Sequence, residues 1–388
     1  MQQMSTRNPK FNSSLIRMMT RVALENDAIN LAQGFPDFDP PKQLLDRLAQ
    51  VSYNGPHQYP ITFGAVNYRR AVAAKCSEHF GRTVDPDTEV LATIGSTEAM
   101  VDTLFALTNP GDRVVMFSPF FENYKAQTIF CDCEPVFVPL IPPTYRFDAN
   151  VLEEEFKKGA KAIILCNPAN PSGRVFTLEE MTVIADLCKK YDVFCITDEV
   201  YEYIVYEGHK MVYMASLPGM WERTISCNSL SKTYSITGWR LGYVTACKQI
   251  MDRIKQYHDF NTVGNPAPLM EAAVTGLTLP DSYYEEFTAH YTHMKDLFCN
   301  GFRSIGIPFT EPEGTYFVLA DMSPFMKKDQ TDEEFCVAMA KKLGVAVVPG
   351  SSFFNEPVHG IVRLHFAKVD DTLNEALNRL QNIRKMLD

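Results

Sequence analysis

Short runs of apolar residues alternate with helical patterns through the middle of the chain. The runs EVLATI, RVVMF, AIILC, VFCIT and TISCN lack polar alternation, as is typical of strands buried on both faces of a parallel sheet. Helical patterns separate them at 98–108, 121–130 and 177–190. The last opens with Thr177 and Glu180, spaced as in a capping box. This order predicts an α/β fold with a mostly parallel, doubly wound sheet over residues 46–280.

The pattern changes beyond residue 280. Further strands are predicted at TYFVLA, VAVV and IVRLHF. Helical patterns lie at 283–300, 332–343 and 370–387. These elements predict a smaller α+β domain over residues 281–388. Residues 1–45 are rich in turn residues, and we expect an N-terminal arm and part of the smaller domain there.

Composition narrows the class of protein. The 388 residues are 46% hydrophobic and 22% charged, enough for a large core, so disordered, coiled-coil and disulfide-stapled classes are excluded. The net charge of −10 has the wrong sign for a nucleic-acid or anionic-membrane binder. No apolar run approaches the roughly 20 residues of a membrane span. We therefore expect neither nucleic acid nor membrane as a partner.

Cysteines and the N-terminus bear on localisation. The ten cysteines, spread from Cys76 to Cys336, form no C-x-x-C pair, which favours reduced thiols in a cytoplasmic protein. The first 24 residues contain several basic side chains and no acid, as transit peptides do. These basic residues are Arg7, Lys10, Arg17 and Arg21. We favour a mature arm instead, because of the Gly34 motif described below.

The stretch from Ser229 to Gly242, SLSKTYSITGWRLG, carries the strongest chemical signal. It places Lys232 and Arg240 after a buried strand, among hydroxyl side chains. At Ser229, Ser231, Lys232, Arg240 and Gly242 it resembles the lysine-attachment signature of class I pyridoxal phosphate-dependent aminotransferases, which have fold type I. The resemblance implies that Lys232 binds pyridoxal 5′-phosphate as a Schiff base. Within that family, the chain looks most similar to kynurenine, glutamine and methionine aminotransferases.

Two loops at strand ends are implied to hold the cofactor ring. Asp198 and Tyr201 follow the strand VFCIT, and Asn170 lies in the loop NPANPSG after AIILC. Ligands bind at the carboxyl ends of parallel strands, although such loops are equally typical of solvated turns. The resemblance implies that Asp198 keeps the pyridine nitrogen protonated. It also implies that Tyr201 and Asn170 hydrogen-bond the ring hydroxyl oxygen.

A helix N-terminus is implied to hold the cofactor phosphate. The residues after the strand VLATI open a helix, whose free N–H groups suit an anion but also fit an ordinary N-cap. The implied phosphate contacts are Gly95, Ser96, Thr97, Ser229, Ser231 and Arg240. Phe121 is implied to stack on the ring, whereas core packing better suits Phe120.

Other segments are implied to meet the substrate or a second subunit. The motif AQGFPDF resembles the arm motif of the family, which implies that Gly34 contacts the substrate carboxylate and that the arm belongs to the mature enzyme. Arg363, otherwise typical of a solvated strand face, is implied to bind the α-carboxylate through a bidentate fork. The implied substrate contacts are Gly34, Asn170, Arg363 and Ile16. Tyr59 is implied to reach the cofactor phosphate of a neighbouring subunit, which predicts a homodimer with shared active sites.

We therefore expect a ping-pong aminotransferase that uses an amino acid and a 2-oxo acid, with Lys232, Asp198 and Tyr201 as catalytic residues and no metal. Ile16 and Thr97 are uncharged, which predicts a substrate pocket whose wall has no cation. Neutral or aromatic donors of the methionine, glutamine, leucine, kynurenine or phenylalanine type should therefore have a higher kcat/KM than aspartate. Alternatives are a carbon–sulfur β-lyase on the same fold, an aspartate-type aminotransferase, and a regulatory protein that binds the cofactor without turnover. A nicotinamide oxidoreductase is disfavoured, because no G-x-G-x-x-G follows a strand.

Overall fold

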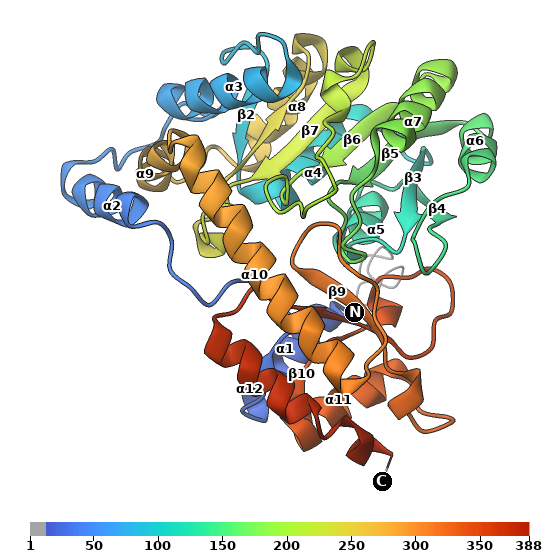
Figure 1. The fold of residues 1–388 in the computed structure, drawn as a ribbon. Coiled ribbons are helices and arrows are strands. Elements are labelled where there is room, and N and C mark those ends of the chain that lie inside the picture. The colour runs from blue at the N-terminus through green and yellow to red at the C-terminus, as the bar shows by residue number, and fades with distance from the viewer. Residues whose placement is uncertain (1–12, 388) are drawn as a thin grey trace, which may run out of the picture.

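The computed structural model describes residues 13–387, which form an α/β part and a smaller α+β part (Figure 1). Arg7 and Lys10, which entered the argument about the N-terminus, lie outside the described residues. The prediction of an α/β fold with a mainly parallel central sheet is confirmed. The domain boundaries at residues 45 and 280 stay a prediction.

The larger sheet has the strand order β2-β8-β7-β6-β5-β3-β4. Its strands are β2 (Val90–Thr93), β3 (Arg113–Ser118), β4 (Glu134–Pro139), β5 (Ala160–Cys166), β6 (Phe194–Asp198), β7 (Thr224–Ser229) and β8 (Gly242–Thr245). Every pairing is parallel except the two made by β8. Strands β4 and β8 had no counterpart among the predicted runs, because β8 begins at the last residue of the lysine motif and β4 itself contains two prolines, Pro135 and Pro139.

Burial on both sheet faces explains the unbroken apolar runs. In β5, Ile163 and Leu165 pack with α6 (Ala149–Lys157) and α7 (Leu178–Tyr191), whereas Ile164 packs on the opposite face with α4 and α8. Further helices surround the sheet: α2 (Lys42–Asn54), α3 (Val66–Phe80), α4 (Gly95–Leu107), α5 (Glu122–Phe130), α8 (Lys248–Asn261) and α9 (Ala267–Leu277). The predicted capping box at the start of α7 is present.

The smaller part joins the two ends of the chain. Strand β1 (Ile29–Asn30) pairs with β10 (Val345–Ala346), and β9 (Phe317–Asp321), β12 (Ile361–His365) and β11 (Val348–Pro349) form a second sheet. The prediction of one strand at VAVV is wrong, since this segment contributes to both sheets. The helices of this part are α1 (Leu15–Glu25), α10 (Asp281–Ile305), α11 (Asp332–Leu343) and α12 (Asp370–Leu380).

Two helices stand out in Figure 1. Helix α10, much longer than the predicted 283–300, crosses from α9 to the smaller part, while α2 projects from the body. Helix α12 ends at Leu380, earlier than predicted, because a final 3-10 turn buries Ile383 and Met386 in the core. No described helix is long and apolar enough to cross a membrane. All ten cysteines, which lie within residues 13–387, carry free thiols.

Candidate active site

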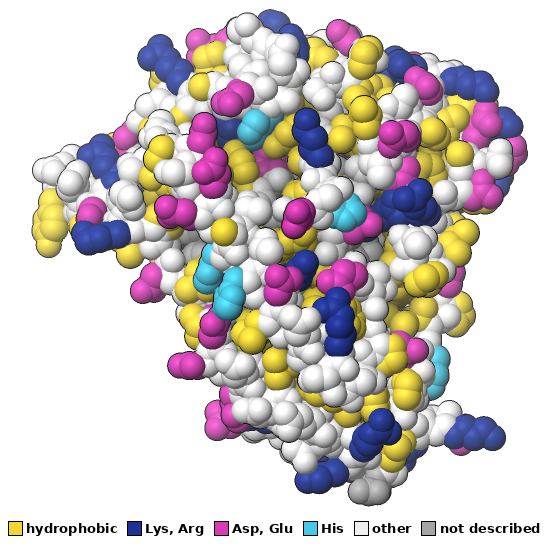
Figure 2. Space-filling model, viewed as in Figure 1, with side chains coloured by type: hydrophobic (Ala, Val, Ile, Leu, Met, Phe, Trp, Pro, Cys, Tyr) yellow, Lys and Arg dark blue, Asp and Glu magenta, His cyan; other side chains and the backbone are white. Residues whose placement is uncertain are grey.

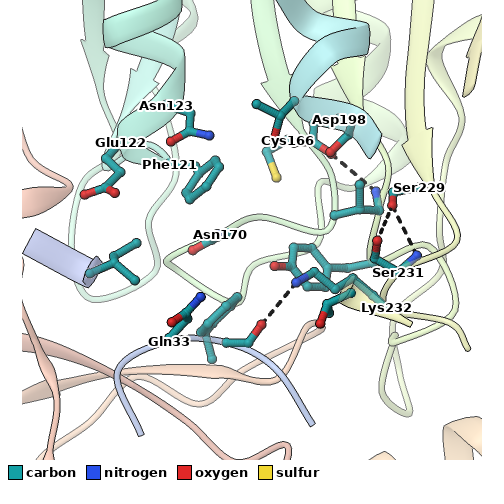
Figure 3. A pocket seen from close by; sticks show the side chains of 18 of the residues that line it. Gln33, Phe121, Glu122, Asn123, Cys166, Asn170, Asp198, Ser229, Ser231 and Lys232 are labelled. Atoms are coloured by element: carbon teal, nitrogen blue, oxygen red, sulfur yellow. Dashed lines mark hydrogen bonds between the residues drawn. The ribbon is translucent and has the colours of Figure 1, made fainter. Parts of the chain in front are cut away.

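A cavity of about 230 Å³ lies where strands β5, β6 and β7 end and helix α1 passes (Figure 3). Most of the expected residues line it: Ile16, Gly34, Ser96, Thr97, Phe121, Asn170, Asp198, Tyr201, Ser229, Ser231, Lys232, Arg240 and Arg363. Gly95 is not among the lining residues but lies directly against Arg240. Tyr59 lies outside the cavity and is 86% exposed.

The Asp198 carboxylate, at the end of β6, is buried and lines the cavity (Figure 3). It accepts hydrogen bonds from the Tyr124 hydroxyl at 2.6 Å and from the Val200 backbone N–H at 3.4 Å. Burial raises the pKa of Asp198, and these two bonds and the charge of Lys232 oppose the rise. A cation next to this carboxylate would remove the cost of burying its negative charge.

Lys232 reaches into the cavity opposite Phe121 and Asn170 (Figure 3). Its Nζ donates a hydrogen bond to the Gly34 carbonyl oxygen at 3.1 Å, and lies about 6 Å from the centres of the Tyr201 and Tyr316 rings. Only glycine fits at position 34, because a Cβ there would lie 2.6 Å from the Phe317 ring.

Tyr201 is enclosed by aromatic rings beside the lysine. Its ring makes edge-to-face contacts with Tyr316 and Phe317, with centroids 5.3 and 5.7 Å away. Burial raises the pKa of the Tyr201 hydroxyl well above its usual value, so the hydroxyl is a neutral donor near pH 7. This protonation state suits a hydrogen bond to an anionic oxygen.

Several donors converge between α4 and the turn after β7. Ser229 donates to the Ser231 hydroxyl at 2.8 Å, and Arg240 donates to the carbonyl oxygens of Thr237 and Ile94 at 2.9 and 3.3 Å. No carboxylate lies within 4.0 Å of the Arg240 guanidinium in the described chain. A Cβ at Gly95, where φ is +74°, would meet this guanidinium at 2.4 Å. The glycine thus lets the α4 N-terminus and the cation face one small space, as a phosphate requires.

Arg363, on β12, lines the same cavity. Its guanidinium donates to the Asn170 side-chain oxygen and to the Ala32 carbonyl, both at 2.8 Å, between the rings of Phe317 and Phe353. The residue is 1% exposed, so the reading of it as a solvated strand position is wrong. Burial lowers the pKa of Arg363 to about 10, which leaves it charged at neutral pH.

These observations fit pyridoxal 5′-phosphate, the cofactor implied by the sequence resemblance. The buried Nε of Arg363 has no hydrogen-bond partner in the described chain. The Gly95 space matches a phosphate, and Asp198 matches a protonated ring nitrogen. The Asp198 carboxylate and the space between Gly95 and Arg240 therefore suit the ring nitrogen and the phosphate of one cofactor. The Arg363 guanidinium suits the carboxylate of one substrate.

The sequence reasoning missed several lining residues. Tyr124 had a usable signal, since it follows Phe121 by three residues and helical spacing brings both to one side. Gln33, inside the motif AQGFPDF, and Cys166, directly before the loop NPANPSG, also line the cavity. The sequence predicted that no cationic side chain lines the substrate pocket. This prediction is wrong, because Arg17 lines the cavity beside Ile16. No local signal identified Arg17, since α1 reaches the cavity only through packing of the smaller part.

Comparisons with known proteins agree with this site. Residues 26–380 match the family described as aminotransferase class I and II. The human protein named kynurenine–oxoglutarate transaminase 1 is 34% identical over an alignment 396 positions long, gaps included, and the alignment covers 93% of this chain and 93% of that protein.

Solved structures give the same result. N-succinyldiaminopimelate aminotransferase from Mycobacterium tuberculosis has a TM-score of 0.93 at 33% identity, covering 98% of this chain and 100% of that one. An Escherichia coli protein described as having a methionine aminotransferase function has a TM-score of 0.92 at 30% identity, with coverage of 98% and 100%. The chain therefore belongs to the class I and II aminotransferases of fold type I, enzymes that depend on pyridoxal 5′-phosphate.

Proposed function

We propose that this aminotransferase moves the amino group of a neutral or aromatic L-amino acid to a 2-oxo acid, by a ping-pong cycle in one cavity. The observation that carries the proposal is Arg363, a buried guanidinium with no carboxylate within 4.0 Å among residues 13–387. An α-carboxylate would complete its hydrogen bonding. Because amino acids and 2-oxo acids share that group, one arginine can serve both halves of the cycle.

The wall of the cavity supports a donor without a charged side chain. Ile16, Phe121 and Phe317 line the inner cavity, and Thr97 adds a small neutral position. An apolar side chain gains about 25 cal/mol per Å² of area that it buries there. We assign the short side-chain carboxylate of aspartate to this apolar wall and not to Arg17 at the mouth, so it would lose its hydration there.

Some residues of the site hold the cofactor, and Lys232 transfers a proton. Bound pyridoxal 5′-phosphate supplies a protonated ring that withdraws electrons from the substrate Cα. We assign Asp198 to the ring nitrogen, Asn170 and Tyr201 to the ring hydroxyl oxygen, and Arg240 to the phosphate. Lys232 receives the proton that leaves the amino-acid Cα and holds it at Nζ. Its hydrogen bond to Gly34 keeps that amine inside the cavity.

A substrate screen tests the donor assignment. The purified holoenzyme is assayed with twenty amino acids against several 2-oxo acids, and we expect methionine, leucine, glutamine and aromatic donors to outrank aspartate in kcat/KM. Aspartate ranking first would contradict the assignment. Pyruvate and ammonia released from a cysteine conjugate, without an acceptor, would instead indicate a β-lyase.

An exposed apolar surface supports a homodimer. Tyr53 on α2, Tyr59 and Phe260 are 88%, 86% and 91% exposed. The segments of Tyr59 and Phe260 adjoin, since a Cβ at Gly264 would lie 3.2 Å from Pro60. Hydrophobic side chains are also visible at the outer end of the projecting α2 region (Figure 2). Apolar surface gathered in this way is typical of an interface. It lies near the cavity mouth, which Asn261 and Thr262 also line.

Hybrid dimers test whether Tyr59 acts across that interface. In a mixture of Lys232→Ala and Tyr59→Ala proteins, a hybrid dimer has one site with both changes and one intact site. We expect the mixture to exceed both parents in activity. Activity no higher than that of either parent would contradict a shared site.

A further inference from the structure

Arg17 stands at the mouth of the active-site cavity, one residue after Ile16 on α1. Ile16 is 8% exposed and lines the inner cavity, whereas Arg17 lines both the inner cavity and a wider outer cavity of about 920 Å³. The two cavities also share Thr97, Lys232 and Arg240. Arg17 therefore lies where the reaction site opens outward.

The Arg17 side chain has no partner in the part of the chain that the structure describes. No carboxylate lies within 4.0 Å of its guanidinium, and only its backbone N–H forms a bond, to the Ser14 side chain at 3.2 Å. A stabilising effect on helix α1 does not explain an arginine at this position either. Arg17 occupies the first turn of α1, which holds no acidic residue, and a cation is unfavourable at that positive end of the helix dipole.

The first of two acidic side chains at this mouth, Glu122, is already engaged. Its two carboxylate oxygens accept hydrogen bonds from the hydroxyls of Ser14 and Ser352. Glu122 therefore ties the start of α1 to the wall of the cavity and does not neutralise Arg17.

Glu98, the second acidic side chain, faces the loop before α4. One of its oxygens accepts the backbone N–H of Ile94, and the other lies 3.6 Å from the His258 ring. Neither carboxylate compensates Arg17, so its positive charge is unpaired among residues 13–387.

The two arginines thus provide two separate anion-binding points in one cavity. Arg363 is 1% exposed in the inner cavity and Arg17 is exposed at the mouth, and the apolar side chains of Ile16 and Phe121 line the inner cavity with them. An extended substrate with a carboxylate at each end would meet both cations. A neutral side chain would contact only the wall.

We propose that Arg17 is a specificity-determining residue that binds the second carboxylate of a dicarboxylic 2-oxo acid, which serves as the amino acceptor. This inference rests on the proposed function, and it names the acceptor class for the same site. One cavity would then accept a neutral donor against its wall and a dicarboxylic acceptor between its two arginines. The outer position of Arg17 favours a five-carbon acid, whose second carboxylate lies farther from the reacting carbon.

Acceptor kinetics of the holoenzyme test the inference. The probes are 2-oxoglutarate and 2-oxopentanoate, which share a five-carbon chain and differ by the second carboxylate, with methionine as donor. We expect the wild type to favour 2-oxoglutarate in kcat/KM by about five- to tenfold, the strength of one partly solvated charged contact. Arg17→Gln should remove this preference and leave kcat/KM for 2-oxopentanoate unchanged. Arg17→Lys, which keeps the charge, should retain part of it.

Arg21→Gln is the matched control, because Arg21 is exposed on the same helix and lines neither cavity. It should behave as the wild type. An equilibrium measurement avoids turnover: calorimetry of the holoenzyme with glutarate should show binding weakened about fivefold by Arg17→Gln, with pentanoate unaffected.

The outcomes separate this inference from the proposed function. A wild type that uses both acceptors equally, or an Arg17→Gln variant that keeps the preference, overturns the role of Arg17 and leaves the proposed function standing. Absence of amino transfer to any acceptor overturns both.

Discussion

The inner end and the mouth of the cavity are built in different ways. At the inner end, Asp198 and Arg363 are 6% and 1% exposed, lie at or within strands, and have short hydrogen bonds to neighbouring groups. At the mouth, Arg17 is exposed on the first turn of α1 and has no partner among the described residues. The inner end is therefore rigid, whereas side chains at the mouth can change with little effect on the fold.

This contrast separates chemistry from selectivity. Groups that hold the cofactor and the α-carboxylate act on every substrate, so they need fixed positions. A group that meets only the distal end of a substrate changes the ranking among substrates and leaves the reaction itself intact. Substitutions at the inner end should therefore lower all rates together, and substitutions at the mouth should change ratios.

Replacing Lys232 should have the largest effect. Lys232→Ala removes both the covalent attachment and the proton carrier, so we expect turnover to fall about 10⁴-fold for every substrate pair. The yellow absorbance of the lysine-bound cofactor should disappear. Full activity in this variant would contradict the role of Lys232, and Lys248→Ala, on the exposed surface of α8, is the control.

Asp198→Asn should lower the rate by two to three orders of magnitude while cofactor is still bound. The reason is the lost ion pair with the ring nitrogen, and breaking such a buried pair costs ~3–5 kcal/mol. Tyr124→Phe sharpens the test, because it removes only the 2.6 Å bond to this carboxylate and should cost roughly tenfold. Single-turnover rates measure both variants, and an unchanged rate in Asp198→Asn would rule out its role at the ring.

Arg363→Lys should lower kcat/KM about 10²-fold for all donors and acceptors alike. Lysine keeps the charge but cannot form the planar fork that meets a carboxylate with two parallel bonds. Steady-state kinetics with one neutral and one dicarboxylic acceptor provide the measurement. A loss confined to one acceptor would contradict the assignment of Arg363 to the shared α-carboxylate.

The smallest expected effect concerns pH and Glu98 at the mouth. Burial raises the pKa of Glu98 from 4.5 to about 7 despite its bond from Ile94, so the folded chain holds a proton that the unfolded chain releases near pH 4.5. The free energy of unfolding should therefore fall as pH rises from 4.5 to 7, by less than about 1.4 kcal/mol per pH unit, and this contribution should level off above pH 7.

His258 contributes in the same direction. Burial acts to lower the pKa of His258, but its hydrogen bond to Asp102 and the charge of Glu98 raise it overall, so its stabilisation is lost as pH rises through the folded-state value. Glu98→Gln should flatten the pH dependence of urea unfolding between pH 5 and 7. A slope equal to that of the wild type would contradict a raised pKa at Glu98.

The same contrast explains what the sequence could predict. Asp198, Asn170 and Lys232 each follow a buried strand, so local patterns and the order of the loops predicted that they meet at one sheet edge. Arg17 gave no such signal. Its place depends on α1 packing against β10 and β11, more than 300 residues away in the chain, and such contacts leave no local pattern.

The division of VAVV shows the same limit. Its apolar residues correctly predicted burial, but pairing with β1 or with β12 is decided by partners distant in sequence. The roles of the site residues, including the placement of Tyr59 in a neighbouring subunit's site, stay predictions that the variants above would test.

The most direct test of the separation between chemistry and selectivity is one ratio, kcat/KM for 2-oxoglutarate divided by kcat/KM for 2-oxopentanoate. It is measured side by side in the wild type, Arg363→Lys and Arg17→Gln. The account predicts that Arg363→Lys lowers both constants and preserves the ratio, whereas Arg17→Gln brings the ratio close to one. A ratio that changes in Arg363→Lys and stays constant in Arg17→Gln would contradict it.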